Sequence, residues 1–220
     1  MSKMRIEGSF VALITPFNRD GSPDFGAFRS LLKFQADHGT EAVLIMGSTG
    51  EVSMLSQKER EAIIAETVKL KTGKMQLFFG CTGNNTQTTI DYLKFAKANG
   101  ADGAVLAAPA YICGPEAVVE DYFLEVADAT DLPLGLYNNP PRVKTDLHWD
   151  NLLRIFKHPN YVVHKESTTR VGQVAQVLRW CHAKHVAVVT QGGLSGLVHG
   201  ADAAAADVIV SLERMRAIED

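Results

Sequence analysis

The stretch AVLIMGSTGE, residues 42–51, shows the pattern that decides the fold. An uninterrupted apolar run is followed at once by glycine, hydroxyl and acidic side chains. A short continuous apolar run is typical of a parallel strand that is buried on both faces of its sheet. Glycines directly after such a run indicate a tight loop. The stretch therefore predicts a buried strand that carries polar groups to one edge of a sheet.

The same pattern recurs along the chain, with amphipathic segments between the apolar runs. Further strands are predicted at residues 10–15, 76–80, 103–108, 134–137, 161–165 and 186–190. Helices are predicted at residues 24–38, 56–70, 86–99, 116–129, 148–156 and 170–182, the second of them opened by a Ser-x-x-Glu capping box. Strands that alternate with helices indicate an α/β protein with a parallel sheet, either open or closed.

Polar and glycine-rich stretches follow the first six predicted strands one after another. In (β/α)8 TIM barrels the functional site is built from the loops at this carboxyl-terminal rim. No GxGxxG follows the first strand, which disfavours a dinucleotide-binding sheet. The pattern therefore favours a barrel, although its last units are weak in this sequence.

Composition excludes several classes of function. The 220 residues are 46% hydrophobic and 21% charged, as in ordinary globular proteins, and the formal net charge is −3. The basic residues are scattered, so the sequence shows no basic patch of the kind that binds nucleic acid or an anionic membrane. No apolar stretch approaches the ~20 residues of a membrane span, and MSKMRIEGSF lacks the apolar core of a signal peptide. With three widely spaced cysteines, this predicts a cytoplasmic protein without a metal site or cofactor.

The stretch YVVHKEST, residues 161–168, delivers Lys165 at the end of a predicted strand. Most lysines simply point into solvent, because burying an ammonium group is costly. Beside Val162 and Val163, and under loops that exclude water, Lys165 would instead be a neutral amine that attacks a ketone to form a Schiff base. Tyr137 ends the preceding strand, and neighbouring strands lie ~5 Å apart. The two side chains can therefore meet, and the phenol can shuttle protons.

The segment MGSTGE, residues 46–51, has two interpretations. It can be an ordinary tight turn that Gly47 and Gly50 make possible. Alternatively, its backbone N–H groups and the hydroxyls of Ser48 and Thr49 form a small nest for a carboxylate. No Lys-Ser/Thr pair follows, so it is not a phosphate-binding P-loop. A keto acid would place its carboxylate in this turn and its ketone at Lys165.

Three of these motifs carry a family resemblance. GSTGE, YNNPPR and HKEST, in this order and at these spacings, resemble the dihydrodipicolinate synthase / N-acetylneuraminate lyase family. The resemblance extends from residue 7 to about residue 190. It implies a (β/α)8 barrel lyase of the class I, pyruvate-dependent type. It also implies that pyruvate and a second small carbonyl compound are the substrates and that the chain forms a homo-oligomer, a dimer or a tetramer.

The resemblance assigns roles to residues by position. Lys165 matches the Schiff-base lysine, and Tyr137 matches the tyrosine that relays protons and contacts bound pyruvate. Ser48 stands where synthases usually have threonine, and Thr49 and Gly50 follow it in the turn that binds the carboxylate.

Two further matches lie in the loops after the fourth and fifth predicted strands. Tyr111 matches a tyrosine that reaches across a dimer interface to complete a relay with Ser48 and Tyr137. Its neighbour Ala110 departs from the usual aromatic pair. Arg142 stands where the synthase branch has an arginine for the carboxylate of its second substrate, and a guanidinium suits a carboxylate because it offers two parallel donors. Taken alone, Arg142 would be interpreted as a solvated loop arginine.

The resemblance leaves three hypotheses for the function. The leading one is 4-hydroxy-tetrahydrodipicolinate synthase, which condenses pyruvate with aspartate semialdehyde. The second is an aldolase or dehydratase of a sugar-derived 2-keto acid, because KESTTR and NNPPRVKTD depart from the glycine and the Arg-Thr-Gly turn that synthases more often show. The third is a non-catalytic remnant of the family.

The last thirty residues decide whether a barrel can be complete. Residues 1–190 are predicted to form barrel units one to seven, and residues 191–220 a divergent segment with one helix from about Ala201 to Ala217. DVIVSL, residues 207–212, could be a strand, but its flanking residues favour a helix. Barrels typically need ~250 residues. We therefore expect a barrel that is incomplete at its C-terminal end, with the gap covered by this segment or by another subunit.

Overall fold

The computed structural model describes residues 8–183, 188–191 and 208–211 of the chain. The strands are β1 (Phe10–Ala12), β2 (Ala42–Ile45), β3 (Gln76–Gly80), β4 (Gly103–Ala107), β5 (Leu134–Asn138), β6 (Tyr161–Glu166), β7 (Val188–Gln191) and β8 (Val208–Ser211). The helices are α1 (Phe25–Asp37), η1 (Val52–Met54), α2 (Gln57–Lys69), α3 (Thr86–Asn99), α4 (Glu116–Asp128), α5 (Pro140–Val143), α6 (Trp149–Ile155) and α7 (Val171–Ala183). All seven predicted strands and the six helices predicted before residue 190 are present, with small shifts of their bounds.

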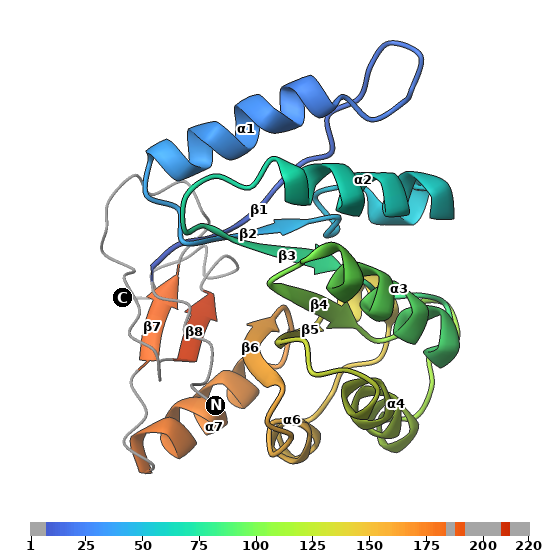
Figure 1. Cartoon of the computed structure of the whole chain (residues 1–220). Helices are drawn as coiled ribbons and strands as arrows, with labels where there is room; N and C mark the ends of the chain where they lie inside the picture. Colours follow the sequence, from blue (N-terminus) through green and yellow to red (C-terminus); the bar gives the residue numbers. More distant parts are fainter. Residues whose placement is uncertain (1–7, 184–187, 192–207, 212–220) are drawn as a thin grey trace.

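Strands β1 to β6 form one parallel sheet in sequential order. The sheet curls, and α1, α2, α3 and α4 lie along its outer side (Figure 1). Strands β7 and β8 pair in parallel with each other, and β8 lies next to β6. Six sequential parallel strands curled with helices outside form part of a (β/α)8 barrel, which confirms the predicted α/β fold class with an incomplete barrel.

Strand β8 corrects one expectation from the sequence. The structure has a strand at Val208–Ser211, inside the range for which a helix was predicted. The reason lies in Val208, Ile209 and Val210, whose β-branched side chains are stiff and favour strands, particularly beside a partner strand such as β7. The flanking alanines and charged residues favour a helix, but they do not decide the structure of this segment. The rest of the predicted helix lies outside the described residues, and the division of the chain at residue 190 stays a prediction.

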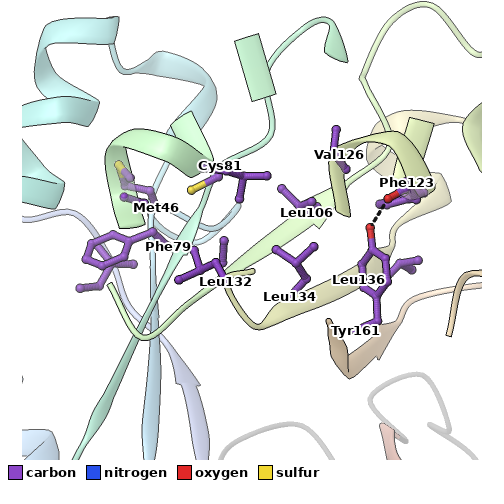
Figure 2. Close-up of a cluster of buried hydrophobic side chains, with 14 of the residues drawn as sticks. Met46, Phe79, Cys81, Leu106, Phe123, Val126, Leu132, Leu134, Leu136 and Tyr161 are labelled. Atoms are coloured by element: carbon purple, nitrogen blue, oxygen red, sulfur yellow. Dashed lines mark hydrogen bonds between the residues drawn. The ribbon is translucent and has the colours of Figure 1, made fainter. Parts of the chain in front are cut away.

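The larger hydrophobic core fills the layer between the sheet and its helices. Alternate strand residues such as Phe79, Leu134 and Leu136 point into it and are fully buried (Figure 2). Tyr161 of β6 is anchored in this layer, because its hydroxyl donates a 2.8 Å hydrogen bond to the carbonyl oxygen of Phe123. Burial raises the pKa of the Tyr161 phenol far above its ordinary range, so the phenol stays a neutral donor.

A smaller cluster marks the concave face of the sheet. Its buried residues are Ala42, Leu44, Phe78 and Val105. They alternate along β2, β3 and β4 with residues of the outer layer, as the period of two in a strand requires. Tyr137 packs against this inner cluster, so its side chain lies on the concave face.

A β-bulge in β6 decides which face receives Lys165. Leu134 of β5 pairs with Tyr161, whereas the next residue, Gly135, pairs with Val163. Val162 is therefore an extra residue, and it reverses the alternation of β6. Without it, Tyr161 and Lys165 would share the outer face, since they are an even number of residues apart.

Gly80, the last residue of β3, lets the loop after β2 pack tightly onto the sheet. Met46 has a left-handed backbone with φ 58°, and an ideal Cβ at Gly80 would lie only 1.9 Å from the Met46 carbonyl oxygen. A backbone atom cannot move away as a flexible side chain can. Any residue larger than glycine must therefore displace the start of the MGSTGE loop.

Gly80→Ala should therefore destabilise the chain by about 3 kcal/mol, the upper end of what forced overpacking usually costs. Gly172→Ala is the matched control, because its new Cβ meets open space and its φ is not in the left-handed region. That variant should be unchanged or more stable by up to about 1 kcal/mol. Urea unfolding of both variants measures the difference, and similar midpoints for the two would contradict the proposed clash.

Candidate active site

Lys165 and Tyr137 meet on the concave face of the sheet. They are directly paired across β5 and β6, and Lys165 Nζ lies 4.3 Å from the centroid of the Tyr137 ring. The structure thus brings together the two residues for which the sequence predicted contact. It differs from the sequence prediction in exposure, because the Lys165 side chain is exposed and no loop of the described residues shields it. An amine and a phenol in contact can exchange protons with a substrate held between them.

Ser167 adds a hydroxyl group to the amine of Lys165 and the phenol of Tyr137. Its role was not predicted from the sequence. Its Oγ donates a 3.2 Å hydrogen bond to the hydroxyl oxygen of Tyr137. Its spacing in the sequence could have indicated it, because residues two apart in a strand face the same side and Ser167 follows Lys165 by two. The structure extends the strand pairing to this residue, since its backbone N–H donates to the Asn138 carbonyl oxygen at 2.9 Å. Lys165, Tyr137 and Ser167 therefore form one contiguous polar group.

The MGSTGE segment forms a turn at the same edge of the sheet. Gly50 N–H donates to the Gly47 carbonyl oxygen at 3.0 Å, and the buried hydroxyl of Thr15 donates to the Gly50 carbonyl oxygen at 2.6 Å. Ser48 and Thr49 are exposed at the tip of the turn. Among the described residues, nothing accepts a hydrogen bond from their backbone N–H groups. These two N–H groups and two hydroxyls are the donors that a carboxylate could use, whereas Gly50 shapes the turn.

Arg60 of α2 stabilises this turn through hydrogen bonds of its guanidinium group. Its guanidinium donates to three backbone carbonyl oxygens: those of Val52 at 2.8 Å, Thr82 at 3.2 Å and Leu55 at 3.3 Å. These acceptors come from η1, from the residue after η1 and from the loop after β3. A single side chain thereby ties the GSTGE loop to the neighbouring loop of the rim.

Tyr111 and Arg142 lie at the rim without contacting the other predicted site residues. Tyr111 is 94% exposed, with a left-handed φ of 76°, and its neighbour Ile112 is 71% exposed. In the described part of the chain, no hydrogen bond joins Tyr111 to Ser48 or Tyr137. The guanidinium of Arg142, in α5, is exposed and has no partner among these residues. Within this one chain Tyr111 does not join the relay, as expected for a residue predicted to reach across a dimer interface, and the roles of Tyr111 and Arg142 stay predictions.

Behind the concave face, Glu166 binds the ends of β5 and β6 together. Its Oε1 accepts hydrogen bonds from the Asn138 side-chain amide at 2.9 Å and from the backbone N–H groups of Ser167 at 2.9 Å and Thr168 at 2.8 Å. Its Oε2 lies 3.2 Å from both His164 Nε2 and Gln173 Nε2. Asn138 and Glu166 directly follow Tyr137 and Lys165, so this cluster fixes the backbone that positions the amine and the phenol.

Asp146 extends this polar network into the loop after α5. Its carboxylate accepts hydrogen bonds from Asn138 Nδ2 at 2.9 Å, Thr168 Oγ1 at 2.7 Å and Arg170 Nε at 2.7 Å. Burial acts to raise the pKa of Asp146, but these three hydrogen bonds and the charge of Arg170 outweigh it, so the pKa is lower than its ordinary value of 3.8. Asp146 is therefore ionised at neutral pH.

The described residues offer neither a metal site nor a membrane-spanning helix. No group of three or more His, Cys, Asp or Glu side chains there could hold a metal ion. None of the described helices combines the length and the apolar character needed to cross a bilayer. The predictions of no cofactor and of a cytoplasmic location remain untested.

The fold and the site define a (β/α)-barrel protein with an amine–phenol pair at the carboxyl ends of neighbouring strands. Comparison with known proteins then identifies the family. The model of the dihydrodipicolinate synthetase family matches residues 5–207. The chain belongs to this family, as the motifs in its sequence indicated.

Relatives named 4-hydroxy-tetrahydrodipicolinate synthase cover most of the chain. The protein from Alcanivorax borkumensis is 37% identical over 176 residues, which are 80% of this chain and 60% of the relative. The dihydrodipicolinate synthase structure from Aquifex aeolicus has 34% identity and a TM-score of 0.74, covering 79% of this chain and 59% of that one. The Acinetobacter baumannii structure, complexed with pyruvate, has 32% identity and a TM-score of 0.76, covering 83% and 63%. The chain spans about 60% of the length of the curated relatives it matches.

The lowered pKa of Asp146 predicts a pH-dependent contribution to stability. A carboxyl whose pKa is lower in the folded state stabilises that state above its unfolded-state value, and this stabilisation is lost as the pH falls through the folded-state value. Asp146→Asn should therefore unfold at lower urea concentration than the parent chain at about pH 7, and the difference should shrink towards about pH 3. A difference that grows on acidification would contradict the assignment. Urea midpoints of both proteins across this pH range provide the measurement.

Proposed function

We propose that the chain acts as a pyruvate-dependent Schiff-base lyase, most specifically as a 4-hydroxy-tetrahydrodipicolinate synthase that condenses pyruvate with aspartate semialdehyde. The observation that supports this best is the position of Lys165 Nζ, 4.3 Å from the ring of Tyr137 on the concave face. The relatives carry the synthase name, and a relative from Acinetobacter baumannii has been crystallised with pyruvate.

In the proposed reaction, the neutral amine of Lys165 attacks the ketone carbon of pyruvate. A nitrogen–carbon bond forms, the carbonyl oxygen leaves as water, and an imine results. Tyr137 supplies and removes the protons that this step requires; the Ser167 hydroxyl is hydrogen-bonded to its phenol, and the Ser48 hydroxyl is a further member of the proposed relay. The carboxylate of pyruvate binds at the turn of Ser48, Thr49 and Gly50, where backbone N–H groups and hydroxyls act as donors.

Loss of a proton from the methyl group then converts the imine into an enamine, whose carbon attacks the aldehyde of the second substrate. Arg142 binds the carboxylate of aspartate semialdehyde through its paired N–H donors. The alternative is an aldolase or dehydratase of a sugar-derived 2-keto acid. The altered loops around Arg142 and after Lys165 support it, and its substrate would not depend on Arg142.

We also propose that the chain works as a homo-oligomer, a dimer or a tetramer. Tyr111 and Ile112 are apolar or aromatic and almost fully in solvent, on a loop whose backbone at Tyr111 is left-handed. Holding a non-glycine residue in this conformation has an energetic cost, and such positions often occur at functional sites. A partner subunit that packs on this loop would bring Tyr111 into the partner's site.

The imine provides the first test of the proposed function. Pyruvate followed by borohydride should add one reduced pyruvate to the peptide that contains Lys165, as measured by mass spectrometry. Lys157→Ala, at an exposed lysine after α6, is the control and should label as the parent chain does. Labelling that persists in Lys165→Ala would rule out this lysine, and a parent chain without any label would support the non-catalytic alternative.

The second test concerns the phenol. Tyr137→Phe keeps the ring below Lys165 but removes the proton donor, so turnover should fall by ~10²–10⁴, the usual contribution of a positioned acid–base group. Tyr92→Phe removes a phenol on α3 outside the site and should leave turnover unchanged. Steady-state kinetics with pyruvate and aspartate semialdehyde measure both. Turnover in Tyr137→Phe equal to that of the control would remove Tyr137 from the mechanism.

A further inference from the structure

The two stretches that depart from the family's usual pattern contact each other in the structure. KESTTR, residues 165–170, follows the lysine, and NNPPRVKTD, residues 138–146, contains Arg142. Asp146 ends the second stretch and Arg170 ends the first. Their side chains form an ion pair, with Arg170 Nε 2.7 Å from Asp146 Oδ2.

Several hydrogen bonds converge on Asp146 in this contact. Arg170 binds Asp146 through its side-chain carboxylate and, with a second guanidinium nitrogen, through its backbone carbonyl oxygen. Thr168 Oγ1 donates to the same carboxylate at 2.7 Å. A further nitrogen of Arg170 contacts His148 Nε2. A planar guanidinium with several directed donors fixes orientation as well as distance, which a single charge cannot do.

The loop that contains Arg142 has other anchors, and several lie at its C-terminal end, where Leu147 is buried, the Leu147 carbonyl oxygen accepts a 2.9 Å hydrogen bond from Gln173 Nε2, and His148 N–H donates to Glu116 Oε2 at 3.1 Å. We define the Arg142 loop as residues 139–148. Val143 is buried, Thr145 Oγ1 donates to the Gly114 carbonyl oxygen at 3.1 Å, and Leu147 N–H donates to Asn138 Oδ1 at 3.1 Å. Lys144 has a left-handed φ of 64°, a conformation that must be held by its surroundings. Asp146 joins this loop to the segment just after Lys165 through Thr168 and Arg170, and the contact between Arg170 and His148 is a second connection.

We propose that Asp146 and Arg170 are a positioning pair that fixes the Arg142 loop relative to the lysine strand and so sets the recognition of the second substrate's carboxylate. This inference rests on the proposed function, because it assigns Arg142 to that carboxylate. The pair does not touch the amine or the phenol: both of its members belong to the outer network, whereas Lys165 and Tyr137 lie on the concave face. Its loss should therefore affect binding of the second substrate and spare imine formation.

A role in stability alone would give a different result. Partly exposed ion pairs contribute ~1 kcal/mol or less to folding. The ion pair between Arg154 and Glu120, which joins α6 to α4, is the matched control: Arg154 Nε lies 2.7 Å and Nη2 2.8 Å from the Glu120 carboxylate oxygens. It has the same chemistry and a similar geometry, but it joins two helices, and the hydrogen bonds of Glu120 go to Asn151 and Arg154 of α6 and not to the Arg142 loop. Any effect shared by both pairs reflects stability, and an effect specific to Arg170 reflects positioning.

The experiment compares Arg170→Gln, Arg170→Lys and Arg154→Gln in the full chain. Arg170→Gln should raise the KM for aspartate semialdehyde by about 10-fold to 100-fold, the size of effect that misplacement by about 1 Å produces. Borohydride trapping with pyruvate should stay at the level of the parent chain. Arg170→Lys keeps the positive charge but loses the several directed donors of the guanidinium, so it should give an intermediate KM. Arg154→Gln should leave the KM unchanged.

A second measurement keeps the test independent of catalysis. Amide hydrogen exchange, followed by mass spectrometry, should become faster in residues 143–148 of Arg170→Gln by about 10-fold, because local opening controls this exchange. The Arg154→Gln control should not change there.

An unchanged KM in Arg170→Gln, or loss of imine trapping together with turnover, would overturn the positioning role. If the parent chain forms no imine at all, the proposed function fails, and the exchange measurement still decides whether the pair holds the Arg142 loop. Unchanged exchange in Arg170→Gln would overturn that as well.

Discussion

The extra residue in β6 is the constraint on which the site depends. Tyr161 is held in the outer layer by burial and by its hydrogen bond to Phe123, and Val162 then reverses the alternation of the strand. A one-residue change of register exchanges the two faces of a strand, so Lys165 reaches Tyr137 only because of this bulge. The bulge thereby separates two tasks: the start of β6 anchors the strand to the helices, and its end faces the concave side.

The same alternation divides the strand ends into a reactive face and a supporting face. Tyr137 and Lys165 point inward, whereas the next residues, Asn138 and Glu166, hydrogen bond to each other at 2.9 Å in the outer layer. Buried polar groups of this kind are costly unless their partners are present, and Glu166 has five. A carboxylate with this many directed contacts has few alternative arrangements, although the buried Nδ1 of His164 has no hydrogen-bond partner among the described residues. The network therefore fixes the backbone from which the amine and the phenol project.

Much of this could be predicted from the sequence, because the signals are local. Continuous apolar runs gave β1 to β7, and the capping box at Ser56 marked the start of α2, where both of its reciprocal hydrogen bonds are present. The opposition of Tyr137 and Lys165 followed from their places at the ends of consecutive parallel strands. The bulge at Val162 could not be foreseen, since a valine in an apolar run looks the same whether it is paired or extra. Strand β8 was missed because a short β-branched run competes with helix-forming neighbours, and only the pairing with β7 decides between them.

The contacts between loops also could not be predicted from the sequence. Thr145 joins the Arg142 loop to Gly114, in the loop that contains Tyr111, and Asp146 joins it to Thr168 and Arg170 after Lys165. Residues that are distant in sequence show no periodic signal, so each looked like an isolated polar residue. Together these contacts link the loops after β4, β5 and β6. A displacement of one of these loops therefore must break a hydrogen bond or move its neighbour, so the positions of Tyr111 and Arg142 at the rim depend on contacts between loops.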